Sequence, residues 1–235
     1  MGEGEVALSQ TRLTSDIINA YPRKIVRHDS PLPPISMGSP FEREAVVDAT
    51  PFRSVIGSLA YLVRGTRLDL VFAVNYLARH LMAPTATHWT ILDHLVGYLL
   101  KTRGHGITLR PGNCSLNLWS DAGWGMRWND PSQVSYSSWH LVQAVNQLTQ
   151  PAQDFKKTIF CDNQVAVQVS INNLSCKRMQ YLERAFFFVN NVIRKHGVVV
   201  KWVTTQEMWA DALTKRLSGK SLTQALRFLN VTGNR

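Results

Sequence analysis

Three short apolar segments, separated by stretches of helical periodicity, constrain the fold of this chain most. The segments are LNLWS at 116–120, TIFCDN at 158–163 and VVVKWV at 198–203. Helical patterns at about 137–148, 164–172 and 180–195 separate them, and a last helix is expected from about Gln206. Parallel strands need helical crossovers between them, and strands that alternate with helices are typical of such a sheet. The sequence therefore predicts an α/β fold with a mostly parallel sheet.

The sequence pattern before these strands predicts helices. Apolar residues recur at intervals of three and four over 51–63, 68–82 and 86–103. Thr85 or Thr87 can cap the third of these helices, and Gly104 stops it. We therefore expect a helical segment over most of 51–112.

Shorter features lie on either side of this helical segment. Residues 5–21 can hold one short helix, and the proline-rich stretch 22–50 predicts an extended linker without a core element. Residues 107–110 and 116–120 flank a turn at Pro111-Gly112-Asn113, a pattern that predicts a β-hairpin.

Charge and composition bound the class of protein. The net charge is +10, with twelve basic and nine acidic residues in 1–112 and fourteen basic and seven acidic residues in 113–235. A basic surface suits a phosphate backbone, although a solvated charged surface explains it equally well. No apolar run reaches the roughly 18 residues of a membrane helix. Three cysteines without a C-x-x-C motif favour reduced thiols, so we expect a cytoplasmic or nuclear protein without a membrane partner.

Aspartates lie at or just after the ends of two of the apolar segments, and a third aspartate follows the last segment. Asp121 and Asp162 end strands, and Asp211 starts or caps an element after the last strand. Ligands collect at the carboxyl ends of parallel strands, and clustered carboxylates favour Mg²⁺ or Mn²⁺. The alternative is three separate solvated aspartates, two of them helix caps.

The residues around these aspartates resemble a known family. LWSDAGWG, IFCDNQVAV and VVVKWVTTQEMWADALTK are similar to the first, third and fourth acidic motifs of the ribonuclease H domain in copia-type LTR retrotransposon Pol polyproteins. The segment from TPFRSVIGSLAYLV to TRGHGITL resembles the connection between polymerase and ribonuclease H in the same polyproteins. In all, the resemblance covers about residues 6 to 217.

This resemblance implies a division of the chain and a set of site residues. It implies an N-terminal remnant and linker at 1–50, a helical connection segment of reverse transcriptase type at 51–112, and a ribonuclease H-like domain at 113–235. The implied catalytic and metal-binding residues are Asp121, Asp162 and Asp211, which in the family hold two Mg²⁺ (or Mn²⁺) ions for hydrolysis of RNA in RNA–DNA hybrids. The implied nucleic-acid-binding residues are Asn163, Lys177, Arg178 and Lys215. Six cations could line a groove for the hybrid duplex, although a solvated face explains them equally well: Lys177, Arg178, Arg184, Arg194, Lys195 and Lys201.

The sequence also departs from the family pattern. The family's fourth carboxylate is a helix Glu, and this chain has no Glu between Glu44 and Glu183. Only about a dozen residues separate Trp124 from Trp139, too few for the two antiparallel edge strands of an intact domain. We therefore expect a ribonuclease H-like sheet that lacks part of its antiparallel edge and has little or no nuclease activity. The chain also has no Asp-Asp pair, so reverse transcription is not expected.

Three functional hypotheses follow. The first is a catalytically impaired, retrotransposon-derived Pol fragment whose ancestral partner is the remainder of the polyprotein. The second is a domesticated, non-catalytic module that binds nucleic acid or protein. The third, ranked last, is an active ribonuclease H with an unconventional fourth ligand.

Overall fold

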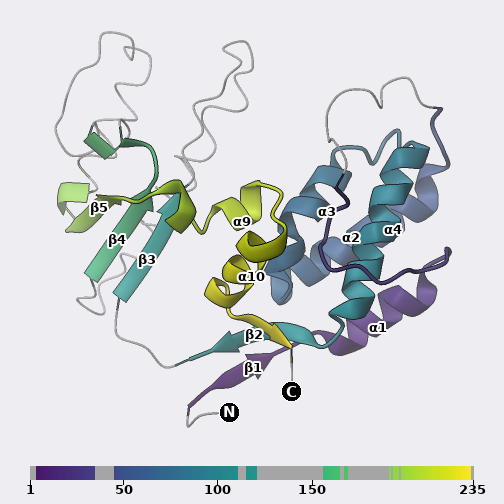
Figure 1. Ribbon diagram of the computed structural model, residues 1–235, viewed down its shortest axis with the longest axis horizontal. Helices are drawn as coiled ribbons and strands as arrows, with labels where there is room; N and C mark the ends of the chain where they lie inside the picture. The colour runs from purple at the N-terminus through teal and green to yellow at the C-terminus, as the bar shows by residue number, and fades with distance from the viewer. Residues whose placement is uncertain are drawn as a thin grey trace. The chain divides into compact units, whose positions relative to one another are not determined.

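The computed structural model groups the chain into two compact units (Figure 1). The first unit holds residues 1–111 and 211–235, and the second unit holds residues 112–210. The structure describes residues 4–34, 45–110, 115–120, 156–164, 167–168, 191, 193–195 and 197–233. The predicted functional division at residues 50 and 112 stays a prediction.

The helices of the first unit lie where the apolar periodicity predicts them. They are α1 (Thr11–Ala20), α2 (Ala49–Gly65), the 3-10 turn η2 (Leu68–Leu70), α3 (Val71–Ala78) and α4 (Ala86–Lys101). Thr85 caps α4 in a capping box whose second member is His88 rather than the usual Glu or Gln. The apolar faces meet in one core, in which Phe52, Leu77 and Leu95 are fully buried.

Residues 21–34, called the strap below, pack along α4. The strap contains no helix or strand, as predicted. The sequence did not predict that the strap contributes a core residue: Leu32 is only 3% exposed and joins the core of the helices. An added Cβ at Gly97 of α4 would lie 1.8 Å from the carbonyl oxygen of Val26, so the strap backbone lies directly on the helix.

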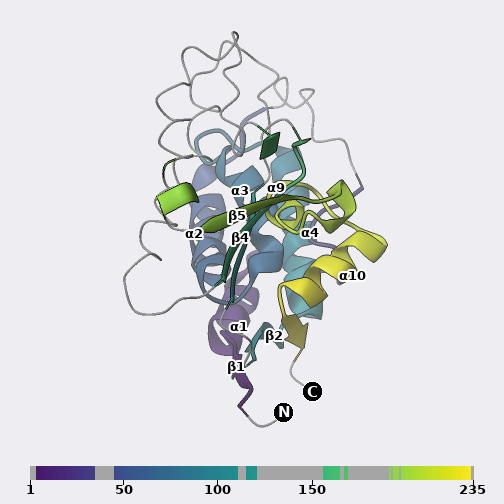
Figure 2. The same ribbon diagram turned by 90° about the vertical axis from the view of Figure 1, so that its left-hand side faces the viewer.

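An antiparallel sheet completes the first unit. Its strands are β1 (Val6–Leu8), β2 (His105–Leu109) and β6 (Val231–Gly233), in the order β1-β2-β6. Both views of the ribbon place this sheet at one end of the helices (Figure 2). The predicted hairpin of 107–110 with 116–120 is therefore wrong, because both sides of β2 pair with strands distant in sequence.

The expected last helix is broken into pieces. The structure has the 3-10 turn η4 (Thr205–Glu207), then α9 (Asp211–Thr214) and α10 (Gly219–Phe228). Gly219 has a φ of +55°, a left-handed conformation that glycine adopts without steric cost, and it starts a new helix direction. A single helix from Gln206 is thus wrong. Within the first unit α9 packs against α3 and η2.

The second unit contains the expected parallel sheet. Strands β3 (Ser115–Ser120), β4 (Lys156–Cys161) and β5 (Val198–Trp202) pair in the order β3-β4-β5, and both pairings are parallel. Ile159 and Val198 are buried on one face of the sheet, with Ile193 packed against them. On the other face, the rings of Trp119 and Phe160 stack 4.9 Å apart.

The α/β class is therefore confirmed, and several finer predictions fall partly or wholly outside the described residues. The helical pattern at 137–148 lies outside them, and of the two later helices only residues 164, 167–168, 191 and 193–195 are described, all as helical. Cys161 is a buried thiol, as expected, whereas Cys114 and Cys176 are not described. In the described part of the chain, no helix combines the length and apolarity needed to span a membrane.

Candidate metal and nucleic-acid site

The carboxyl ends of β3 and β4 lie at the same edge of the parallel sheet. Ser120, the last residue of β3, is the register partner of Cys161, the last residue of β4. Asp162 directly follows Cys161 and is partly buried at this edge. Asp121 directly follows Ser120 in the sequence but lies outside the described residues.

The end of β5 fixes the backbone around Asp162. The indole Nε1 of Trp202 donates a hydrogen bond to the carbonyl oxygen of Asp162 at 3.0 Å, and the backbone N–H of Val203 donates to the carbonyl oxygen of Cys161 at 3.0 Å. Trp202 is 46% exposed, so its indole holds this turn through a hydrogen bond at the surface of the sheet. No described residue makes a hydrogen bond or ion pair with the Asp162 carboxylate.

Asn163 continues this turn into the helical residues that follow. Its carbonyl oxygen accepts a hydrogen bond from the backbone N–H of Val167 at 3.0 Å. The Asn163 side chain is partly buried. This part of the predicted site is thus a tight strand-to-helix connection.

Asp211 has a partner of its own in the first unit. It is the first residue of α9, and its Oδ1 accepts a hydrogen bond from Lys215 Nζ at 2.8 Å. The Asp211 side chain is 14% exposed, and that of Lys215 is 48% exposed. Opposite charges four residues apart on a helix attract each other, so Lys215 competes with any cation for Asp211.

The predicted gathering of Asp121, Asp162 and Asp211 stays a prediction. The structure assigns Asp162 to the second unit and Asp211 to the first unit, and it does not describe Asp121. Among the described residues, no three His, Cys, Asp or Glu side chains gather in a way that could hold a metal ion. The predicted nucleic-acid contacts Lys177 and Arg178 also lie outside the described residues.

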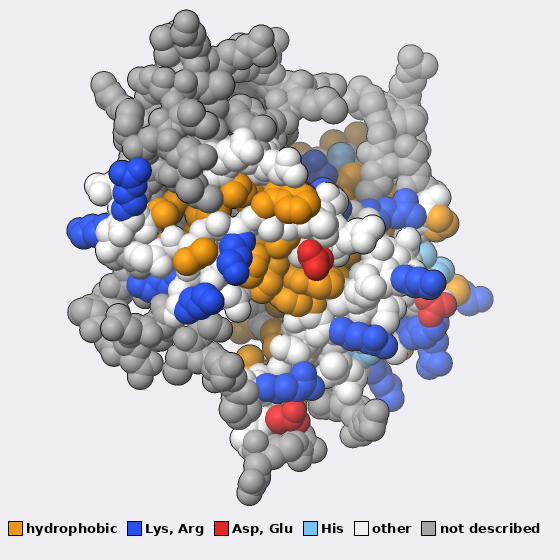
Figure 3. Space-filling model, turned by 60° about the vertical axis from the view of Figure 1, so that its left-hand side comes forward, with side chains coloured by type: hydrophobic (Ala, Val, Ile, Leu, Met, Phe, Trp, Pro, Cys, Tyr) orange, Lys and Arg blue, Asp and Glu red, His pale blue; other side chains and the backbone are white. Residues whose placement is uncertain are grey.

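The structure adds a basic feature that the sequence analysis did not single out. Lys156 and Lys157 are the first two residues of β4, and Lys156 is exposed. Figure 3 shows Lys and Arg side chains near apolar side chains on the described surface. In the sequence, the pair Lys156-Lys157 directly before the apolar run TIFC could have indicated this basic feature.

Comparison with known proteins supports the relationship inferred from the motifs. The chain is 29% identical to the retrovirus-related Pol polyprotein from transposon RE2 of Arabidopsis thaliana and 28% identical to that from transposon RE1, over 90% of its own length in each case. It is 24% identical over 74% of its length to the corresponding protein from transposon TNT 1-94 of Nicotiana tabacum. No family model and no solved structure matches the chain.

The chain is thus similar to retrovirus-related Pol polyproteins encoded by transposons. The relatives come from copia-type elements, so the resemblance expected from the three acidic motifs is confirmed. The chain spans about a sixth of their length, 17% for RE2 and RE1 and 16% for TNT 1-94.

Proposed function

We propose that this retrotransposon-derived chain carries a ribonuclease H-like sheet that binds nucleic acid and cleaves the RNA of RNA–DNA hybrids slowly or not at all. The observation that carries the proposal is the parallel register of β3 with β4, in which Ser120 pairs with Cys161. The next residues in the chain, Asp121 and Asp162, follow two neighbouring strands at one edge. Ligand sites of open parallel sheets lie at this edge.

The chemistry of these side chains suits a hard divalent cation. Carboxylate oxygens are preferred ligands of Mg²⁺ and Mn²⁺, and Asp211 would supply a third carboxylate. Bound metal would lower the pKa of water and stabilise the leaving oxygen of a phosphodiester. In this proposal Asp121, Asp162 and Asp211 hold the metal, and Asn163, Lys177, Arg178 and Lys215 contact the nucleic acid.

Two observations support impaired catalysis. The sequence lacks a Glu between residues 44 and 183, where the family places its fourth carboxylate. Asp211 already pairs with Lys215, so metal binding there has to displace an ammonium group. Since outer-shell partners alone affect metal affinity about 10–100-fold, the loss of a direct ligand should weaken binding further.

The test is a cleavage assay on the full chain. A labelled RNA–DNA hybrid is incubated with Mg²⁺ or Mn²⁺ and with the wild-type protein, Asp162→Asn or Asp16→Asn. The third protein is the matched control, because Asp16 is exposed on α1 and its substitution removes the same charge. We expect trace cleavage at most, and any cleavage should disappear in Asp162→Asn alone.

Rapid hydrolysis by the wild-type protein would overturn the claim of impairment. It would favour an active ribonuclease H with another fourth ligand. Metal-dependent hybrid binding that is the same in Asp162→Asn and Asp16→Asn would argue against the proposed metal site itself.

A second candidate is a non-catalytic binding module. The observation that favours it is the set of exposed cations on the second unit, which form no salt bridge with any described residue. Hybrid binding that weakens steeply with salt, without cleavage, would support this function.

A further inference from the structure

Four basic residues of the second unit lie where two neighbouring chain segments enter the parallel sheet. Lys156 and Lys157 begin β4, and Arg194 and Lys195 are helical residues just before β5. We call these four residues the basic edge. They belong to the amino edge of the sheet, opposite the end where Asp162 lies.

The register brings the two pairs of cations close together. Lys157 is the register partner of Val198, the first residue of β5, and Lys195 precedes Val198 by three residues. Three chain steps of about 3.8 Å and one strand spacing of about 4.8 Å put the Cα atoms of Lys157 and Lys195 within about 16 Å. Lys and Arg side chains reach far enough for all four charges to contact one extended ligand.

The charges of the basic edge are not balanced by described acids. Lys156, Arg194 and Lys195 are exposed, and no salt bridge joins any of the four residues to a described residue. The described acids of this unit, Asp162 and Glu207, follow the carboxyl ends of β4 and β5. The described sheet thus has four cations at its amino end, whereas Asp162, Glu207 and the exposed Lys201 lie at or beyond its carboxyl end.

Local structure explains only half of this arrangement. Cations at the end of a helix are stabilised by its dipole, which suits Arg194 and Lys195. Lys156 and Lys157 lie on a strand, where no such dipole acts, and their like charges add to those of the helix end. A polyanion would offset this repulsion.

We propose that the basic edge binds the phosphodiester backbone of nucleic acid without regard to sequence or metal. The inference rests on the proposed function in assigning nucleic acid as the partner, but it uses none of the predicted metal ligands. Neutralisation of phosphates by Lys and Arg supplies most non-specific affinity and makes it salt-dependent. All four members are cations with no aromatic side chain among them, so they recognise charge rather than bases.

The experiment measures binding of a labelled DNA duplex to the full chain in EDTA, at salt concentrations from about 50 to 200 mM. Lys156→Gln/Lys157→Gln is compared with Lys24→Gln/Arg27→Gln, a matched pair of exposed cations in the strap of the first unit. The basic-edge pair should weaken binding on the order of tenfold and lower the slope of log affinity against log salt by roughly 2. The strap pair should change both quantities much less.

Equal losses in the two variants would overturn the inference, because net charge alone would then explain binding. Absence of duplex binding by the wild-type chain would also overturn it, and so would equal binding to anionic lipid vesicles that competes with the duplex. Asp162→Asn should bind the duplex normally in EDTA. A different result would contradict the proposed function: metal-dependent binding of the RNA–DNA hybrid that Asp162→Asn leaves unchanged.

Discussion

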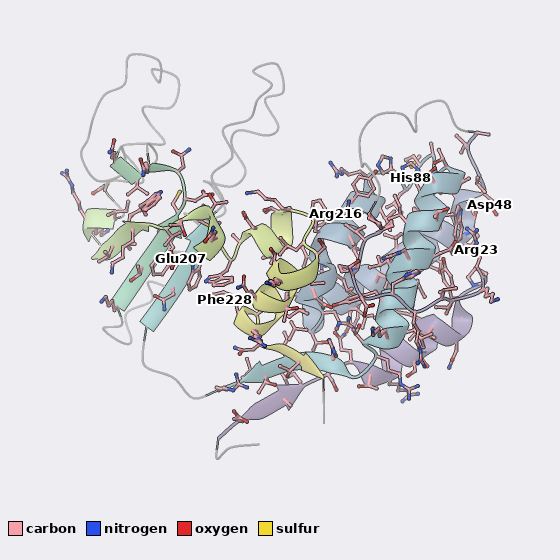
Figure 4. The ribbon with its side chains drawn as sticks, in the orientation of Figure 1. Arg23, Asp48, His88, Glu207, Arg216 and Phe228 are labelled. Atoms are coloured by element: carbon pink, nitrogen blue, oxygen red, sulfur yellow. The ribbon has the colours of Figure 1, made fainter. Side chains whose placement is uncertain are left out.

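The two units use their basic side chains in different ways. In the first unit Arg67 is fully buried and donates from Nε and Nη2 to the Asp69 carboxylate at 3.0 and 2.8 Å. Arg23 pairs with Asp93 at 3.3 Å and lies on the side of the unit where Asp48 and His88 are also found (Figure 4). In the described part of the second unit, Lys156 and the other cations of the basic edge have no acidic partner.

This difference separates a structural role from a binding role for the same residue types. A buried, bidentate guanidinium specifies how helices and loops pack, and its charge is compensated inside the protein. An exposed, unpaired cation adds little to stability and keeps its charge available to a ligand. Removal of a buried cation such as Arg67 should therefore affect stability, whereas removal of a cation of the basic edge should affect binding.

The largest expected effect comes from Arg67→Met. This change leaves Asp69 buried without its cation and removes the hydrogen bonds from Arg67 to the carbonyl and hydroxyl oxygens of Thr102. The free energy of unfolding, measured by denaturant titration, should fall by about 3–5 kcal/mol. Lys101→Met breaks the exposed pair with Asp29 and serves as the control, with a much smaller expected loss because exposed ion pairs add little to stability. Similar losses in the two variants would show that burial of the pair is not decisive.

The second effect tests the contact of the strap with α4. Gly97→Ala places a methyl group against the carbonyl oxygen of Val26, and overpacking of this kind costs about 1–3 kcal/mol. Gly57→Ala is the matched control, because Gly57 is exposed on α2 and an added Cβ there meets no atom within 4 Å. The control should gain up to about 1 kcal/mol, since alanine favours the helix. A neutral or stabilising Gly97→Ala would contradict the close approach of the strap.

A smaller, pH-dependent effect concerns His94, which faces the strap. Burial and the nearby charge of His28 lower the pKa of His94, and the charge of Arg216 acts in the same direction. The hydrogen bond with the Ser30 carbonyl acts in the opposite direction. The His94 and His28 rings stack 3.7 Å apart, so a positive charge on His94 is unfavourable beside His28.

The sign of the pH dependence follows from the lowered pKa of His94. The folded protein favours the neutral ring, so the His94 contribution to stability is complete above the unfolded pKa of about 6.5 and is lost as the pH falls below it. The measurement is the free energy of unfolding at pH values above and below about 6.5. When the pH falls across this range, His94→Gln should lose less stability than the wild type. His80 and His105, whose pKa values are also lowered by burial, keep part of the dependence in the variant. Identical pH dependence in the two proteins would exclude His94 as a contributor.

The smallest expected effect is that of Lys156→Gln on stability. Lys156 is exposed and pairs with no described acid, so its neutralisation should change the free energy of unfolding by no more than about 0.5 kcal/mol. The measurement is the same denaturant titration used for Arg67→Met. A loss above 1 kcal/mol would mean that Lys156 supports the fold, and the distinction between the units would fail there.

Local patterns in the sequence predicted most elements but not their long-range partners. The 3.6-residue period of Trp89, Leu92 and Leu99 locates α4, and the strand–helix alternation predicts the parallel sheet. The pairing of β2 with β1 and β6 was not predicted. Partners such as Val6 and Leu109, or Ile107 and Val231, are far apart in the sequence, so no local pattern links them. Leu32 escaped for a related reason: a single apolar residue among prolines has no period.

The candidate site was predictable only in part. The strand-end positions of Asp121 and Asp162 follow from the motif order and the parallel fold, although Asp121 itself lies outside the described residues. The pair of Asp211 with Lys215 was readable as a spacing of four residues on a helix, but the family motif directed the interpretation to metal and nucleic acid. Three-dimensional register was needed to bring Lys157 and the residues before Val198 together.

The antiparallel sheet makes the second unit an insertion within the first. Residues 112–210 form the second unit and lie in the sequence between β2 and α9, which both belong to the first unit. The later strand β6 pairs with β2 and completes the antiparallel sheet. A deletion within the second unit need not unfold the first unit, because the two parts of the first unit pair directly through β2 and β6. Conversely, a stop codon placed soon after α9 would remove α10 and β6, so Ile107 of β2 would lose its partner Val231. Damage to the first unit can therefore arise from the far end of the gene.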